Sequence, residues 1–189
     1  MKISSWMLPV LMVVAAGQLA IPAYMIQRQE VTLREGRAYK FKTAPVDPYD
    51  AFRGRYVALR FEQDHARCMG KNQVQGGTKV YALIEEDPDG FAVVRELSLQ
   101  PPATGDFFKV QLGYNGNNAN MAYFTMPFDR YYMEETKAPR AELAYAKHNR
   151  RGMSAESAYA LVRVRKGYAA LENVFVAGKP IAEFALEKP

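Results

Sequence analysis

The sequence predicts an α+β fold, mainly antiparallel β-hairpins with one short helix at about residues 138–150, preceded by an N-terminal transmembrane helix. Three observations support this fold class. An apolar segment without a charged side chain extends from Trp6 to Ile26. Short stretches of alternating apolar and polar residues follow it, separated by turns rich in glycine, proline and asparagine. One helical pattern interrupts them, with Pro139 near its start and Gly152 beyond its end.

Length and composition favour one globular domain after the apolar segment. The chain has 189 residues, of which 49% are hydrophobic and 24% are charged, as is typical of folded proteins. We expect a short flank at 1–5, a membrane anchor at 6–26 and a single β-rich domain at 27–189. Of the 25 basic and 20 acidic residues, only Lys2 lies before residue 27, so the domain has 24 basic and 20 acidic residues and a net charge of +4; this mild excess favours an anionic lipid surface or an acidic partner. Nucleic acid is not expected as a partner, because the basic residues are dispersed and no RNA-binding signature accompanies them.

The segment from Trp6 to Ile26 is long enough to remain in the membrane as an anchor. At about 1.5 Å per residue, a helix of this length spans the ~30 Å hydrocarbon layer, so the lipid bilayer is the first expected partner. One alternative is a cleaved signal peptide, for which the small residues at 13–15 and 19–23 offer weak cleavage sites. A buried core helix is the other alternative.

The charges beside this segment leave its orientation open. Arg28, Arg34 and Arg37 follow it, whereas only Lys2 precedes it, and this distribution alone would keep the domain in the cytoplasm. Long domains, however, translocate largely regardless of charge. We therefore expect a single-pass protein with its domain outside the cytoplasm. The single cysteine, Cys68, excludes an intramolecular disulfide but does not decide the compartment.

The first strands of the domain are predicted by period-two patterns. Apolar and polar residues alternate through 31–33 and 39–41, on either side of Glu35-Gly36, which predicts a hairpin with a tight turn. Residues 55–61 predict one further strand, whose inward side consists of Val57, Leu59 and Phe61.

Three more strand pairs follow from the same alternation: 80–85 with 91–99, 107–112 with 121–126, and 159–164 with 168–175. Two of these hairpins resemble each other. Tyr81-Ala82-Leu83 recurs as Tyr159-Ala160-Leu161, and Gly90-Phe91-Ala92 recurs as Gly167-Tyr168-Ala169. We interpret 80–99 and 158–176 as a weak internal repeat, although hairpins with a glycine turn also converge by chance.

Residues 45–61 resemble the bacterial GDYXXLXY family, which is named for the motif Gly-Asp-Tyr-x-x-Leu-x-Tyr. They read Pro-Val-Asp-Pro-Tyr-Asp-Ala-Phe-Arg-Gly-Arg-Tyr-Val-Ala-Leu-Arg-Phe. The motif falls on Gly54, Tyr56, Leu59 and Phe61, but Arg55 stands where the family has Asp, and Phe61 stands where it has Tyr.

The layout of the rest of the chain is also similar to the family. A membrane segment precedes the motif, Arg130-Tyr131-Tyr132 followed by Glu134 comes later, and the last hairpin ends in Ala177-Gly178-Lys179. The resemblance implies an envelope protein without an assigned activity, often found beside multi-spanning membrane proteins. It brings no catalytic residue and no cofactor.

The motif has a structural interpretation. Asp47 suits a helix N-cap, Pro48 suits the first helical position, and Gly54 can adopt a positive backbone φ. The arginine at position 55 argues against a catalytic role for that position, because it replaces the carboxylate of the family motif. We therefore predict that the motif forms scaffold: Asp47, Pro48, Gly54, Arg55, Tyr56, Leu59 and Phe61.

A second cluster is the better candidate for an interaction surface, because tyrosine and arginine are enriched in binding hot spots. Its members are Arg53, Asp129, Arg130, Tyr131, Tyr132 and Glu134. The alternative interpretation is a strand edge with Tyr131 or Tyr132 in the core.

The enzymatic alternatives have weaker support. No Gly-x-Ser-x-Gly frames a serine, while Ser-Lys chemistry stays open because spatial partners are invisible in a sequence. His65 and Cys68 have a ligand-like spacing with His148 as a distant third, but these residues are few for a metal site, so we expect ordinary loop residues and no metal. Paired carboxylates are the least weak catalytic pattern: Asp47, Asp50, Asp129, Glu134 and Glu135.

These observations, together with the family resemblance, favour a non-enzymatic accessory protein that crosses the bacterial inner membrane once. We expect its domain on the periplasmic or outer face, in contact with a polytopic membrane protein or another envelope component. A carboxylate-dependent envelope hydrolase is the alternative.

Overall fold

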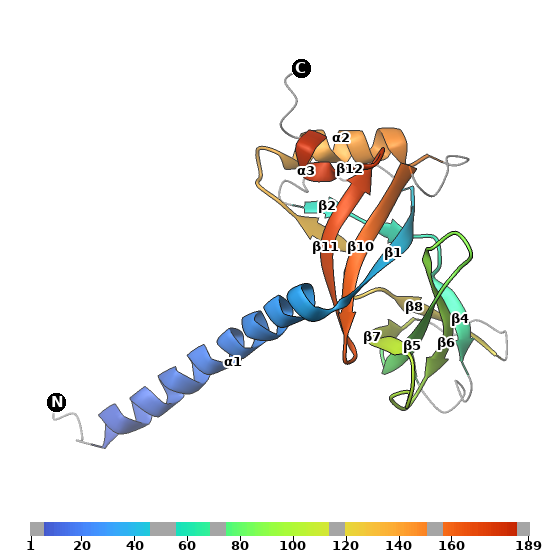
Figure 1. Cartoon of the computed structure of the whole chain (residues 1–189). Coiled ribbons are helices and arrows are strands. Elements are labelled where there is room, and N and C mark those ends of the chain that lie inside the picture. Colours follow the sequence, from blue (N-terminus) through green and yellow to red (C-terminus); the bar gives the residue numbers. More distant parts are fainter. Residues whose placement is uncertain (1–5, 46–55, 69–74, 114–119, 151–156, 185–189) are drawn as a thin grey trace.

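The computed structural model describes residues 6–45, 56–68, 75–113, 120–150 and 157–184. A long helix projects from a β-rich body, and the N-terminus lies at the far end of this helix (Figure 1). The body consists of an open antiparallel sheet, a closed barrel, a two-stranded sheet and two short helices. The predicted α+β class with an N-terminal helix is confirmed.

Helix α1 (Met7–Glu35) is continuous and longer than predicted. The predicted hairpin with a first strand at residues 31–33 was wrong. Helix α1 continues through these residues, and the first strand begins only at Arg37. Residues 27–35 are mostly good helix formers, and Glu30 forms an ion pair with Arg34 one turn later at 3.7 Å. Its stretch Pro9–Glu35 is long and apolar enough to cross a membrane, and the most apolar part is exposed.

Gly36 permits the close passage from α1 into the first strand. Its N–H donates to the carbonyl oxygen of Thr32 at 2.9 Å and thereby closes the helix. A Cβ atom at position 36 would lie 2.4 Å from that carbonyl oxygen and 3.0 Å from the Cβ of Arg163. The junction between helix and sheet is therefore too tight for a side chain at this position.

The open sheet has the strand order β12-β11-β10-β1-β3, with all neighbours antiparallel. Its strands are β1 (Arg37–Ala44), β3 (Arg60–Phe61), β10 (Ala158–Arg165), β11 (Tyr168–Val176) and β12 (Lys179–Pro180). The helices α2 (Ala138–His148) and α3 (Ile181–Phe184) lie together at one end of β10 and β11 (Figure 1). Helix α2 confirms the helix predicted at about 138–150, whereas α3 was not predicted.

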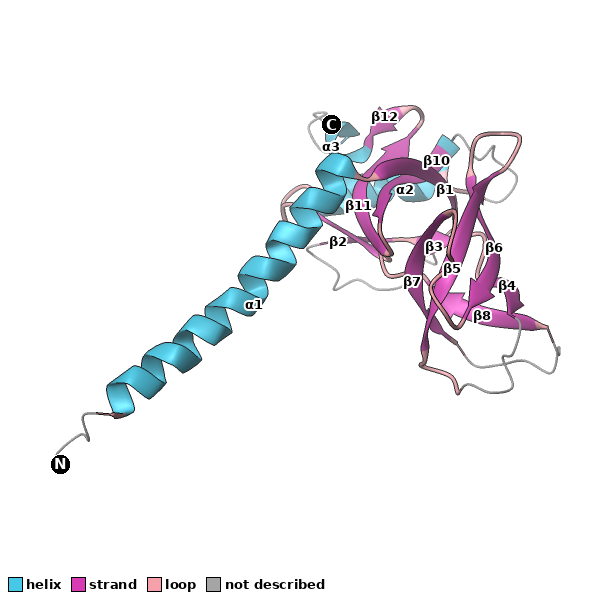
Figure 2. Ribbon diagram, turned by 60° about the horizontal axis from the view of Figure 1, so that its bottom comes forward, coloured by secondary structure: helices cyan, strands magenta, loops and turns pink. Residues whose placement is uncertain are grey.

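The barrel lies beside the sheet (Figure 2) and closes in the order β4-β6-β5-β7-β8. Its strands are β4 (His65–Cys68), β5 (Lys79–Glu86), β6 (Ala92–Ser98), β7 (Asp106–Leu112) and β8 (Met121–Thr125). The pair β4–β6 is parallel, and the other pairs are antiparallel. The three strand pairs predicted from alternation are confirmed as β5–β6, β7–β8 and β10–β11.

The strand predicted through 55–61 is divided, because its two halves pair with different partners. Strand β2 (Tyr56–Ala58) pairs with β9 (Arg130–Tyr132), whereas β3 pairs with β1. Between them the N–H of Leu59 donates to the carbonyl oxygen of Asp129 at 2.8 Å. The predicted inward side is confirmed, since Val57, Leu59 and Phe61 are all buried.

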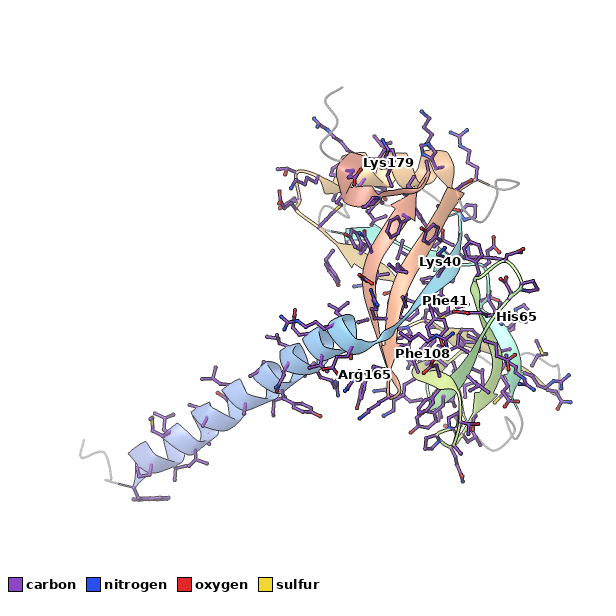
Figure 3. The ribbon with its side chains drawn as sticks, viewed as in Figure 1. Lys40, Phe41, His65, Phe108, Arg165 and Lys179 are labelled. Atoms are coloured by element: carbon purple, nitrogen blue, oxygen red, sulfur yellow. The ribbon has the colours of Figure 1, made fainter. Side chains whose placement is uncertain are left out.

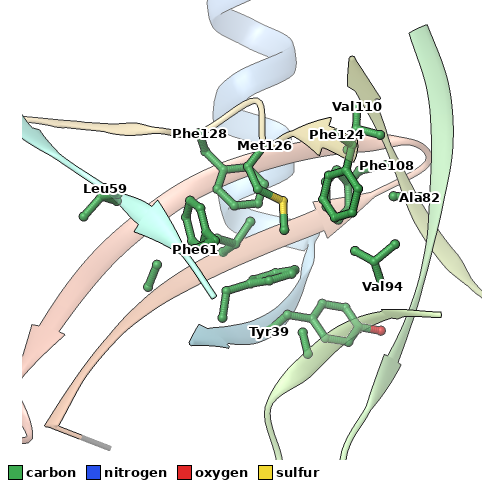
Figure 4. Close-up of a cluster of buried hydrophobic side chains, with 14 of the residues drawn as sticks. Tyr39, Leu59, Phe61, Ala82, Val94, Phe108, Val110, Phe124, Met126 and Phe128 are labelled. Atoms are coloured by element: carbon green, nitrogen blue, oxygen red, sulfur yellow. The ribbon is translucent and has the colours of Figure 1, made fainter. Parts of the chain in front are cut away.

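Four phenylalanines join the sheet to the barrel, and Figure 4 labels Phe61, Phe108 and Phe128 among them. Phe41 comes from β1, Phe61 from β3, Phe108 from β7, and Phe128 follows β8. Their contacting ring centroids are 5.3 to 6.2 Å apart, mostly in edge-on or tilted arrangements, which are the favoured geometries of aromatic pairs. The sheet and the barrel therefore share one continuous core.

The two similar hairpins correspond in detail although one belongs to the barrel and the other to the sheet. The register of β5–β6 shifts between Leu83 and Ile84, and that of β10–β11 shifts at the matching position, between residues 161 and 162. Both hairpins also carry an ion pair at matching positions, with the charges exchanged: Glu85 with Arg95, and Arg163 with Glu172. The internal repeat remains an interpretation of the sequence. The matching register shifts and ion pairs show that the two hairpins also correspond in structure.

Candidate interaction surface

The sheet of β2 and β9 brings together two segments that are far apart in the sequence. The motif strand lies antiparallel to the strand of the predicted interaction cluster, and Tyr56 is opposite Tyr132. In the same register, Ala58 is opposite Arg130. Directly opposed residues on one face of such a pair have Cβ atoms about 4.5–5.5 Å apart, so their side chains interact.

Three of these side chains form a layered surface, which we call the Tyr–Arg–Tyr surface: Tyr56, Arg130 and Tyr132. The ring centroids of Tyr56 and Tyr132 are 5.7 Å apart, and the guanidinium of Arg130 lies 5.1 Å from the Tyr56 centroid. Hydrogen bonding to Tyr132, together with the nearby Asp129 carboxylate, raises the pKa of Arg130. Tyr132 is 67% exposed and the Arg130 side chain is 51% exposed, so both the cation and the neighbouring aromatic ring are accessible to solvent.

Tyr131 points to the opposite side of the same strand, as the period of a β-strand requires. It is half-buried and packs against the core, and this burial raises the pKa of its hydroxyl. Each interpretation of the cluster therefore holds for one of the two tyrosines. Tyr131 packs against the core, whereas Tyr132 is exposed and belongs to the candidate interaction surface.

The two acidic members of the predicted cluster are both exposed, and each lies beside a cation. Asp129 is exposed and its Oδ1 lies 3.8 Å from the Nε of Arg130. Glu134 is exposed and forms a 2.7 Å ion pair with Lys137 just before α2. The predicted site residues Arg53, Asp47, Pro48, Gly54 and Arg55, and the carboxylate Asp50, lie outside the described residues.

A family model described as "GDYXXLXY protein" matches residues 18–174, which is most of the chain. The chain belongs to the GDYXXLXY family. The match includes the second half of α1, the barrel, the Tyr–Arg–Tyr surface and the open sheet as far as Val174 of β11. Searches of curated proteins and of solved structures found no match.

In this GDYXXLXY protein, the segment of His65 and Cys68 is not the loop that we expected. It forms β4, in which His65 is exposed and Cys68 is buried, because residues three apart in a strand point to opposite faces. The two side chains therefore cannot bind one ion together. Asp64 Oδ1 lies 2.8 Å from Nδ1 of His65.

Sequence reasoning missed a polar cleft between sheet and barrel, with a volume of about 600 Å³. The hydroxyl of Tyr39 donates to Asp106 Oδ2 at 2.6 Å, and Arg37 lies 3.6 Å from Asp106 and 3.4 Å from Glu86. Burial and the Asp106 carboxylate raise the pKa of Tyr39 far above its usual range, so this hydroxyl is a hydrogen-bond donor and not a base. No local signal relates Tyr39 to Asp106, because the two residues lie on strands that are distant in the sequence.

Proposed function

We propose that this GDYXXLXY protein is a non-enzymatic, membrane-anchored interaction protein of the bacterial envelope. Helix α1 crosses the inner membrane once and holds the β-rich domain at its periplasmic or outer face, where the domain binds a multi-spanning membrane protein. One observation carries this proposal: the first part of α1 is apolar and exposed, whereas its last turns pack against the domain.

The first part of α1 exposes a continuous apolar surface. Its exposed large side chains are Trp6, Met7, Val10, Leu11, Met12, Val13, Val14, Leu19, Ile21, Tyr24, Met25 and Ile26. Soluble proteins rarely expose apolar patches of this extent, because water contact with apolar surface is unfavourable. Lipid would cover this surface, and each Å² removed from water contributes about 25 cal/mol.

The last turns of α1 are fixed to the β10–β11 hairpin. Thr32 is buried, and Arg165 of β10 forms a 2.7 Å ion pair with Glu35. The guanidinium of Arg28 lies 4.1 Å from the ring centroid of Tyr168. The domain is thus docked on the helix itself, with no flexible spacer between them, so an anchored α1 keeps the domain close to the bilayer.

The Tyr–Arg–Tyr surface suits contact with a protein partner close to the bilayer. Figures 1 and 2 show β2 on the side of the body from which α1 departs, and β9 pairs with β2. A partner with extramembrane loops beside α1 could reach both elements. The hydrolase alternative gains no support from Asp129 and Glu134, since both are exposed and each lies beside a cation.

The test is site-specific photocrosslinking in native membranes. A photoreactive amino acid at Tyr132 should capture a membrane protein, whereas the same group at Leu143, which is 72% exposed on α2, should not. The captured protein is identified by mass spectrometry. Equal labelling at both positions, or capture of nothing at native expression, would contradict the partner proposal.

The anchor is tested separately by carbonate extraction. The full-length chain should stay in the washed membrane fraction. Release of a shortened protein lacking the N-terminal segment would instead identify a cleaved signal peptide.

A further inference from the structure

A groove of about 300 Å³ lies between the barrel and the start of β11. Val110, Met126 and Ala169 form an apolar part of its lining. Its polar lining comes from the barrel strands and from β11 of the open sheet: Lys79, Lys109, Gln111, Thr125 and Tyr168.

The tip of the β10–β11 hairpin contributes Gly167 to the lining of this groove. Gly167 pairs with Phe108 of β7 in an isolated bridge, and the N–H of Lys109 donates to the carbonyl oxygen of Gly167 at 3.3 Å. A Cβ atom at Gly167 would lie 3.0 Å from the Phe107 ring, and φ at this glycine is +83°. The two-residue turn of Lys166 and Gly167, both with positive φ, therefore fits the barrel only with glycine at its second position.

The groove opens beside the end of the apolar part of α1. Tyr168, which lines the groove, has its ring centroid 4.1 Å from the guanidinium of Arg28 and 5.7 Å from the Nζ of Lys109. Arg28 is the first charged residue after the apolar segment. Figure 3 shows Arg165 at the same hairpin tip, next to the end of α1.

The charge around the groove is positive and not neutralised. Lys79 and Lys109 are exposed, and within the described part of the chain neither forms an ion pair with a carboxylate. The nearby carboxylates of α1 form ion pairs with arginines, Glu30 with Arg34 and Glu35 with Arg165.

We propose that this groove binds the headgroup of an anionic phospholipid from the membrane that α1 enters, with Lys79 and Lys109 on the phosphate. The inference rests on the proposed anchoring by α1. Lysine ammonium groups are compact cations suited to phosphate, and Gln111 and Thr125 offer hydrogen bonds to headgroup hydroxyls. Tyrosine is also one of the residues favoured at the headgroup level of a membrane–water interface, which suits Tyr168 to this site.

The experiment uses the full-length chain in a neutral detergent. Binding of phosphatidylglycerol and of phosphatidylcholine is measured by titration and by native mass spectrometry. We expect a preference for phosphatidylglycerol, and we expect the double variant Lys79→Gln/Lys109→Gln to weaken its binding about 30-fold, roughly fivefold for each lysine. The matched control is Lys40→Gln/Lys179→Gln, which removes two exposed lysines that Figure 3 shows away from the end of α1 and which should keep the preference.

Three results would overturn the proposal. They are equal binding of both lipids, retention of the preference by Lys79→Gln/Lys109→Gln, and full competition by inorganic phosphate, which would identify a site for a soluble anion. Failure of the proposed membrane anchor can be distinguished from failure of the headgroup site, because carbonate would then extract the wild-type protein from membranes. A protein that resists carbonate but shows no lipid preference would disprove only the headgroup site.

Discussion

The hydroxyl of Tyr39 on β1 donates a 2.6 Å hydrogen bond to the carboxylate of Asp106 on β7. This contact joins the open sheet to the barrel at the edge of their common core, with Tyr39 itself only 4% exposed. A hydrogen bond to a charged acceptor is stronger than a neutral one, and its geometry fixes the relative position of the two strands.

Replacement of Tyr39 by phenylalanine should lower the free energy of unfolding by about 1 kcal/mol. Hydrogen bonds to charged groups contribute roughly 1.5–3 kcal/mol, but Asp106 is partly exposed, and water would replace the lost donor in part. Thermal unfolding in detergent measures the change. Tyr123→Phe is the control, because Tyr123 is 51% exposed, and an equal loss in both variants would contradict this role of Tyr39.

Stability should fall as the pH rises above about 10. Burial raises the pKa of Tyr145 on α2 to about 12, whereas a tyrosine in the unfolded chain ionises near 10. Above pH 10 the unfolded chain loses this proton while the folded chain keeps it, so the stabilising contribution present below pH 10 is lost progressively towards pH 12. The loss for this one residue is on the order of 2 kcal/mol.

The measurement is urea unfolding between pH 8 and pH 11. Tyr145→Phe should show a shallower decline than the wild type, because it removes one of the titrating groups. Parallel curves for the two proteins would show that Tyr145 does not titrate differently in the two states.

Replacement of Leu59 by alanine should lower the free energy of unfolding by about 2 to 5 kcal/mol, through lost burial and the cavity that remains. Leu59 is 6% exposed, whereas Leu143→Ala removes a leucine that is 72% exposed and should change stability little. Both variants are compared by melting temperature and by recovery of the crosslinked partner. A Leu59→Ala protein with the wild-type melting temperature but without its partner would make the motif a functional surface.

Replacement of Gly36 by alanine should loosen the junction of α1 with the sheet. The new methyl group would meet the Thr32 carbonyl oxygen, and overpacking of this kind destabilises by about 1 to 3 kcal/mol. Gly17→Ala is the control, since nothing lies within 4 Å of a Cβ at that position. Faster proteolysis after Arg34 and a lower melting temperature are expected only for Gly36→Ala.

Exchange of the charges in the β5–β6 hairpin should be tolerated. The pair Glu85–Arg95 corresponds to Arg163–Glu172 with opposite polarity, so Glu85→Arg/Arg95→Glu should melt close to the wild type. The single variant Glu85→Arg should melt lower, because it places a second positive charge where the carboxylate of Glu85 now pairs with Arg95. A double variant that melts lower than either single variant would show that the two hairpins are not equivalent at this pair.

Local patterns in the sequence were sufficient for the main strands, the helix near 138–150 and the apolar segment of α1. In each case the side chains repeat with the period of the element and are buried or exposed on one face. The inward side of Val57, Leu59 and Phe61 follows for the same reason. The pattern failed at residues 31–33, because two apolar residues in so short a stretch fit a strand and a helix turn equally well, and the packing of α1 on β10 and β11 selects the helix.

The sequence by itself thus determined the strands of the three long hairpins, which family motif the chain carries and that a membrane-length apolar helix precedes them. Only the tertiary structure decided that residues 56–58 pair with β9, that Tyr131 faces the core while Tyr132 faces solvent, and that Lys109 and Arg28 both approach Tyr168. The physical reason is that periodicity is a property of neighbouring residues. Pairing between distant strands depends instead on which arrangement buries the whole set of apolar faces in one core.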